Sequence, residues 1–94
     1  MKVVWTKPAL RDLNGARDYI AEESLGAAAR VVDRIETALQ GLRRYPAIGR
    51  PGRVEATREL VIAGTPFIAV YIVNAKRIEI VALIHGARRW PDAL

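Results

Sequence analysis

The hydrophobic pattern of this chain changes once, at Pro46, and this change limits the folds that the chain can adopt. Before Pro46, apolar side chains recur every three or four residues across residues 9–20 and 28–42, as they do along one face of a helix. After Pro46, apolar residues stand instead in short continuous runs separated by turn-forming residues, which is typical of strands. The sequence therefore predicts a helical first half followed by a sheet.

Two helices with a short connection are expected before Pro46. The first begins after Thr6, whose hydroxyl can cap it, carries Pro8 in its first turn and ends near Glu23. The second begins after Ser24 and is ended by Pro46, which cannot continue the hydrogen bonding of a helix. Because so few residues separate them, the two helices should form an antiparallel hairpin.

Four runs of residues read as strands: a short one at 3–5 and three longer ones at 58–62, 67–73 and 78–84. The run at 67–73 is apolar on both faces, so this strand should be central and covered. Short turns join the last three runs, which therefore form an antiparallel meander. The predicted fold is α+β with the order β-α-α-β-β-β, an antiparallel sheet packed on a helical hairpin, and the whole chain, 1–94, is read as one domain.

Positive charge is concentrated in the second half of the chain. Residues 1–42 hold six bases and six acids, whereas residues 43–94 hold nine bases and four acids and carry the whole net charge of +5. Twelve of the fifteen bases are arginine, whose planar guanidinium suits carboxylates and phosphates. The pattern favours an anionic partner, while a solvated basic face would give the same count.

The composition argues against several classes of site. The chain has no Cys and one His, which excludes disulfides, thiolate metal sites and a histidine cluster for zinc, so no metal and no cofactor are expected. The lack of Cys fits a reducing compartment. No signal-peptide pattern and no membrane-spanning apolar run is found, so we expect a cytoplasmic protein without membrane contact.

A series of short motifs runs along nearly the whole chain. In order, they are Trp5-Thr6 with Ala9, Asp12-Leu13, Tyr19-Ile20-Ala21, Pro46, Gly49-Arg50-Pro51-Gly52, Thr57-Arg58-Glu59-Leu60, Tyr71 and His85-Gly86-Ala87-Arg88-Arg89-Trp90-Pro91. With these motifs the chain resembles toxins of the RelE/ParE superfamily, and within it the ParE branch. The resemblance implies the toxic component of a type II toxin–antitoxin system, held inactive in a hetero-oligomer by a ParD-like antitoxin. ParE-like toxins act on DNA gyrase, whereas RelE-like relatives cut mRNA on the ribosome.

The resemblance and the charge pattern together suggest which side chains contact the antitoxin or the target. These candidates are cationic or aromatic and lie in the second half: Arg50, Arg53, Arg58, His85, Arg88, Arg89 and Trp90. Arginines would pair with the acids of an antitoxin, and Trp90 would pack or stack. A structural interpretation stays open beside this one, with Arg50 and Arg53 solvated in a loop and His85 hydrogen-bonded at a strand end.

RNA cleavage requires more specific side chains than inhibition by binding does. A 2′-hydroxyl must lose a proton and a leaving oxygen must gain one. Only if the chain is a nuclease are Arg58, His85 and Glu55 candidates for its catalytic set. Glu59 follows Arg58 in a strand and therefore faces the other side of the sheet, which leaves Glu55 as the freer carboxylate. The Lys-rich loop and terminal Tyr of some RelE-like enzymes are missing. Three functions therefore stay open: gyrase inhibition by binding, ribosome-dependent mRNA cleavage, and an inactive module that binds only its antitoxin.

Overall fold

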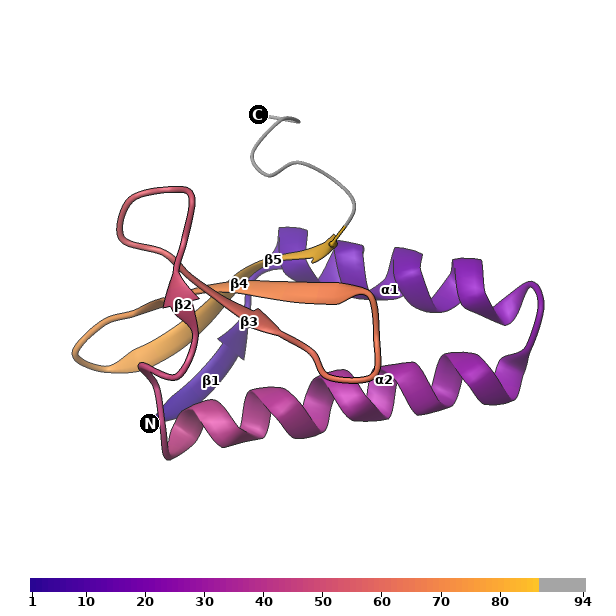
Figure 1. Cartoon of the computed structure of the whole chain (residues 1–94), viewed down its shortest axis with the longest axis horizontal. Helices are drawn as coiled ribbons and strands as arrows, with labels where there is room; N and C mark the ends of the chain where they lie inside the picture. Colours follow the sequence, from indigo (N-terminus) through magenta and orange to yellow (C-terminus); the bar gives the residue numbers. More distant parts are fainter. Residues whose placement is uncertain (87–94) are drawn as a thin grey trace.

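A computed structural model describes residues 1–86 of this chain, which form a helical hairpin packed against a five-stranded sheet (Figure 1). The elements in chain order are β1 (Lys2–Trp5), α1 (Lys7–Ala21), α2 (Leu25–Gln40), the short 3-10 helix η1 (Gly41–Arg43), β2 (Arg50–Pro51), β3 (Arg58–Val61), β4 (Phe67–Val73) and β5 (Arg77–His85). Across the sheet the strand order is β1-β5-β4-β3-β2. The predicted α+β class, element order and helical hairpin are confirmed.

The sheet is mixed, which corrects one detail of the prediction. Strands β2 to β5 pair antiparallel as expected, but β1 pairs with β5 in parallel, from Lys2 opposite Arg77 to Trp5 opposite Ile80. The parallel pair arises because the hairpin returns the chain to the end where β1 begins, and a three-strand meander then brings β5 back in the direction of β1 (Figure 1). Strand β2 was expected to be loop because of its Gly and Pro neighbours, and Pro51 is tolerated there because β2 is an edge strand.

Helix α1 is fastened to β5 by polar contacts in its first two turns. The Thr6 hydroxyl oxygen accepts the N–H of Ala9 at 3.3 Å, and the same hydroxyl donates to the carbonyl of Ile80 at 2.8 Å. One turn later the carboxylate of Asp12 accepts the backbone N–H of Leu83 at 3.0 Å. The residue that caps the helix therefore also fixes its position against the sheet.

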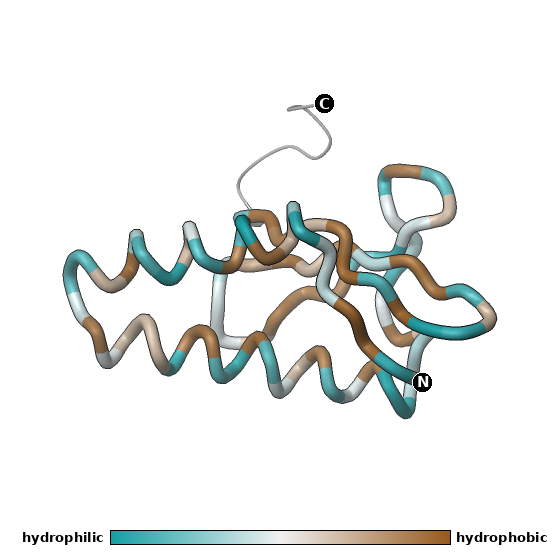
Figure 2. The backbone as a smooth tube through the Cα atoms, turned by 180° about the vertical axis from the view of Figure 1, so that it is seen from behind, coloured by the Kyte–Doolittle hydropathy of each residue, from teal (hydrophilic) through white to brown (hydrophobic). Residues whose placement is uncertain are grey.

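Helix α2 supplies Ile35 and Leu39 to the core, beside Ala9 and Leu13 of α1. Its cap is as predicted, with the Ser24 hydroxyl accepting the N–H of Ala27 at 3.1 Å. Apolar and polar residues alternate along both helices at helical spacing (Figure 2). The apolar side chains packed between the two layers are all nearly inaccessible and include Ile35, Leu39, Leu42, Ile62, Ala69, Tyr71, Ile78, Ile80 and Leu83. Burying one such Leu or Ile is worth about 1.5–3 kcal/mol, so this layer holds the fold together.

Strand β4 is the middle strand of the sheet, as its apolar sequence predicted. Residues Phe67 to Tyr71 are all buried. A register shift between Val70 and Tyr71 leaves Val81 as an extra residue of β5, as in a β-bulge. The turn between β4 and β5, the start of β1 and strand β2 all lie at the end of the molecule remote from the tip of the helical hairpin (Figure 1). Among residues 1–86, no helix is long and apolar enough to cross a membrane.

Candidate functional site

A buried carboxylate, that of Glu59, organises the loop that leads into β3. Glu59 is 2% exposed and lies opposite Val70 of β4, on the sheet face turned away from the helices. One of its oxygens accepts two hydrogen bonds from the guanidinium of Arg50, at 3.0 and 3.2 Å. The other accepts the backbone N–H of Arg53 at 3.0 Å and lies 3.6 Å from the Nε of that side chain. Both arginines are therefore held by one acid.

The ionised form of Glu59 is the stable one in this setting. Burial by itself raises the pKa of Glu59, but the N–H of Arg53, the hydrogen bonds from Arg50 and the charges of both guanidinium groups more than offset this effect. The net result is a pKa below the ordinary value of a glutamate. A charged carboxylate in this position requires both arginines, because an unpaired buried charge is costly.

A second set of polar contacts holds the same loop from the helix side of the sheet. Arg58 donates from one Nη to the carbonyls of Gly49 and Ala47, at 2.7 and 3.2 Å. The hydroxyl of Tyr71, a fully buried residue, accepts the N–H of Gly49 at 2.9 Å and donates to the carbonyl of Pro46 at 2.8 Å. Burial raises the pKa of Tyr71 despite the Gly49 bond and the Arg58 charge, so the hydroxyl stays protonated and can donate.

These contacts require glycine at position 49. A Cβ on Gly49 would lie 2.6 Å from the Tyr71 hydroxyl and 3.0 Å from the carbonyl oxygen of Glu59. We call the six residues that fasten this loop on both faces of the sheet the clamp: Gly49, Arg50, Arg53, Arg58, Glu59 and Tyr71. The clamp fastens the loop to the sheet, and it uses three of the predicted binding arginines to do so.

The structure places two of the candidate catalytic residues, Arg58 and His85, far apart. Arg58 pairs with Tyr71 and His85 with Phe67, so they lie on opposite sides of β4 and about 13 Å apart along it. The ring of His85 meets that of Phe67 edge-on, with centroids 5.8 Å apart. Glu55 is exposed in the loop beyond β2. Arg58 and His85 are therefore outside hydrogen-bond reach of each other and of a common phosphate.

A groove runs between α2 and the far end of β3. It has a volume of about 510 Å³ and is lined by Arg30, Asp33, Arg34, Thr37, Ala38, Ile62 and Ala63. Strand β2 covers only Arg58 and Glu59, so in the described part of the chain the outer edge of β3 is open beyond them. The groove combines two cations and one acid with apolar side chains beside a strand edge that is open among the described residues.

The described residues hold no cluster of metal-binding side chains. Within residues 1–86, no three His, Cys, Asp or Glu side chains gather closely enough to hold a metal ion. Three predicted contact residues, Arg88, Arg89 and Trp90, lie outside the residues that the structure describes.

Comparison with known proteins identifies the family. A profile described as the ParE toxin of the type II toxin–antitoxin system parDE matches residues 3–90. The chain belongs to the ParE toxin family. This ParE-type toxin is 45% identical over 93 residues to Y4kP, a candidate toxin of Sinorhizobium fredii, with 99% of the chain and 96% of that protein covered. It is 41% identical over 87 residues to toxin RelE2 of Caulobacter vibrioides, covering 93% of the chain and 97% of that protein.

A solved structure supports the same assignment. A chain of the chromosomal ParDE toxin–antitoxin system of P. aeruginosa matches this toxin with a TM-score of 0.81 and 28% identity, over 90% of the chain and 95% of that structure. The chain is thus a ParE-type toxin of a type II toxin–antitoxin system, as the resemblance of its motifs indicated.

Several motifs of this ParE-family toxin have a structural explanation. Thr6 and Asp12 attach α1 to β5, and Gly49, Glu59 and Tyr71 build the clamp. Sequence reasoning placed Glu59 correctly on the face opposite Arg58 but missed that it would pair with arginines. The available signal was a lone acid in an apolar strand, six and nine residues after two arginines of a tight loop.

Proposed function

We propose that this toxin is neutralised by a cognate ParD-like antitoxin that docks an acidic, amphipathic segment in the groove between α2 and β3. Arg30 and Arg34 would pair with acids of that segment, while Ala38 and Ile62 would receive its apolar side chains. The open edge of β3 would add backbone hydrogen bonds to an extended part of the segment. The match to a chain of a ParDE system supports an antitoxin as the partner.

We further propose that the free toxin stops growth by binding DNA gyrase, without bond-making chemistry of its own. The observation that carries this proposal is that the polar groups near β3 are already occupied by hydrogen bonds and ion pairs within the chain. The Arg58 guanidinium donates to two carbonyls, and Glu59 is shared by two arginines. Groups held in this way are poor proton carriers, and His85 is a strand length away.

Ribosome-dependent mRNA cleavage is the second candidate, because a relative with 41% identity carries the name toxin RelE2. In that case His85 would be the general base or acid, with Arg58 or Glu55 recruited by movement on the ribosome. The third candidate is an inactive module that binds only its antitoxin.

One induction experiment separates the three candidates. The toxin is expressed without antitoxin, and DNA breaks, the SOS response and mRNA integrity are followed in the same culture. A gyrase poison gives double-strand breaks and SOS induction while mRNA stays intact early on. Early mRNA cleavage that disappears in His85→Ala would replace gyrase inhibition with nuclease activity, and the absence of any growth effect would leave the inactive module.

The docking site of the antitoxin is tested by co-expression. Arg30→Glu with Arg34→Glu should abolish neutralisation, because two attractive charges in the groove become repulsive. The control is Arg11→Glu with Arg17→Glu on the exposed side of α1, which gives the same change in net charge. Equal rescue of growth by the antitoxin for both pairs would move its docking site away from the groove.

A further inference from the structure

One end of the molecule combines unneutralised positive charge with exposed apolar side chains. It is formed by η1 and the segment after it, the start of β1 and the β4–β5 turn, which lie together opposite the tip of the helical hairpin (Figure 1). We call it the cationic end and define it by Lys2, Arg43, Arg44, Tyr45, Ile48, Val73, Lys76 and Arg77.

Backbone contacts show that these segments are neighbours. Lys2 lies opposite Arg77 in the parallel pair of β1 and β5, about 4.8 Å away across the sheet. The backbone nitrogen of Met1 lies 3.5 Å from the carbonyl oxygen of Arg43. Val73 pairs with Ile78, the residue that follows Arg77. The start of β1, the end of η1 and the β4–β5 turn are therefore neighbours at one end of the molecule.

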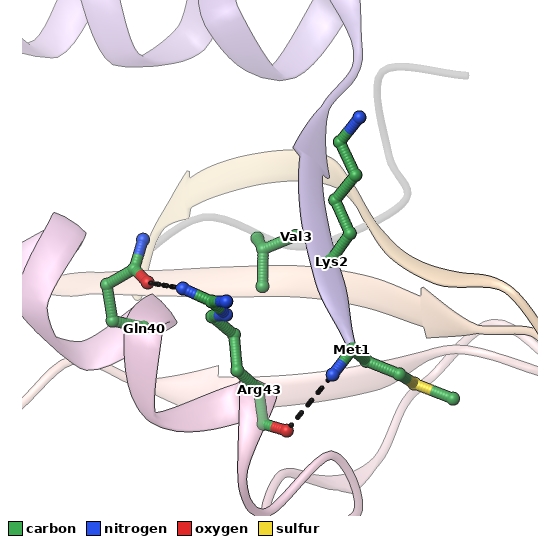
Figure 3. A pocket seen from close by; sticks show the side chains of 5 residues that line it. All are labelled: Met1, Lys2, Val3, Gln40 and Arg43. Atoms are coloured by element: carbon green, nitrogen blue, oxygen red, sulfur yellow. Dashed lines mark hydrogen bonds between the residues drawn. The ribbon is translucent and has the colours of Figure 1, made fainter.

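Most of the charge at the cationic end has no internal counter-charge. Arg77 pairs with Glu79 at 3.0 Å, but within residues 1–86 no carboxylate pairs with Lys2, Arg43 or Lys76. A hollow of about 430 Å³ is lined by Met1, Lys2, Val3, Gln40 and Arg43. Among residues 1–86, the Arg43 guanidinium donates only to the side-chain oxygen of Gln40 (Figure 3). These cations are therefore available to pair with a negatively charged partner.

The apolar part of the cationic end points to a protein as that partner. Tyr45, Ile48 and Val73 are 60%, 64% and 40% exposed. Tyrosine next to arginine is the composition of binding hot spots between proteins. A phosphate backbone is bound by charged and hydrogen-bonding groups, and it offers nothing to the aliphatic side chains of Ile48 and Val73.

We propose that the cationic end is the surface with which this toxin docks on gyrase, against an acidic patch with an apolar centre. The inference rests on gyrase being the target. It assigns the target surface and the antitoxin groove to different residues, since none of the residues that define the cationic end lines the groove. Tyr45 and Ile48 would supply the apolar anchors, and Arg43, Arg44 and Lys76 would supply steering and specificity.

Direct binding of purified gyrase to the full-length toxin tests this inference. Tyr45→Ala with Ile48→Ala should weaken binding by about 30-fold, as expected for removal of a hot spot. Arg43→Glu with Arg44→Glu should weaken it at least as much and slow association. The matched controls are Tyr19→Ala, a tyrosine 76% exposed on α1, and Lys7→Glu with Arg11→Glu, which should stay within about threefold of the parent.

Each other outcome overturns a defined statement. If the parent toxin binds gyrase and the cationic-end variants bind equally well, the inference fails while gyrase remains the target. If the parent does not bind gyrase, the proposed function fails and the inference fails with it. If the variants keep gyrase binding but lose binding to a bare DNA duplex, the cationic end is a nucleic-acid surface. Thermal unfolding within about 2 °C of the parent checks that every variant is folded.

Discussion

The clamp and the cationic end use the same kind of side chain in opposite ways. In the clamp, Arg50 and Arg53 share the buried carboxylate of Glu59, and Arg58 donates to two carbonyls. At the cationic end, Lys2 and Lys76 make no side-chain contact with an acid of residues 1–86. The positive charge of this chain is therefore a sum of structural cations and cations that are available to a partner. Which of them can meet a partner depends on where the acids are buried.

The largest effect should follow the loss of the Glu59 charge. Glu59→Gln keeps the shape of the side chain but leaves two guanidinium groups without their counter-charge, so we expect a loss of about 2–3 kcal/mol in the free energy of unfolding. The value is moderated because the side chains of Arg50 and Arg53 are 52% and 41% exposed and can reach water. Urea unfolding at pH 7 measures it. Glu55→Gln, in the exposed loop, is the control and should change little.

The same variant has a defined pH dependence. The folded-state pKa of Glu59 is lowered, so its stabilising effect is fully present above the unfolded pKa of about 4.3 and is lost as the pH falls through the lower folded pKa. The difference in unfolding free energy between parent and Glu59→Gln should accordingly shrink on acidification below pH 4.3. A difference that stays constant down to the acid transition would mean that the ionised carboxylate contributes nothing.

A smaller loss is expected when the helix-side contact of the clamp is removed. Tyr71→Phe deletes the hydroxyl that joins Gly49 to Pro46 and leaves a buried N–H without its acceptor, which should cost about 1–2 kcal/mol. Thermal unfolding measures the loss, and hydrogen exchange at the Gly49 amide should rise with it. Unchanged protection of that amide would show that the loop is held by the Glu59 side alone.

The smallest effect should come from the cationic end. Lys2→Gln with Lys76→Gln removes two exposed charges and no internal contact of the described residues, so stability should stay within about 0.5 kcal/mol of the parent.

The clamp variant Arg58→Gln serves as the comparison. It removes one charge but two hydrogen bonds to carbonyls and should cost about 1–2 kcal/mol in the free energy of unfolding. Equal losses for the two variants would erase the distinction between structural and available cations.

The pattern of apolar residues was sufficient to predict the layers of the fold. A helix or strand that buries one face has apolar residues at regular spacing in the sequence. Thr6 and Ser24 were recognised as caps, since a cap depends only on its local neighbours. Strand β2 and the parallel pairing of β1 were missed. The first has two residues and little local signal, and the second depends on contacts more than seventy residues apart.

The candidate site was predicted less well for the same reason. Arg50, Arg53 and Arg58 were found by their charge, but their partners are a carboxylate and carbonyls that only folding brings within reach. His85 was a nuclease candidate together with Arg58, yet the register of β4 places the two residues far apart along the sheet.

By itself, the sequence determined that this chain forms a helical hairpin on a small sheet and that its excess positive charge lies after residue 42. Apolar periodicity and composition are local properties, so both can be read directly. Only the tertiary structure decided that Glu59 neutralises two arginines, that Tyr71 and Gly49 fasten the loop, and that Lys2 and Arg77 lie side by side. These contacts join residues distant in sequence, and a buried charge or hydroxyl is stable only where the fold supplies its partner.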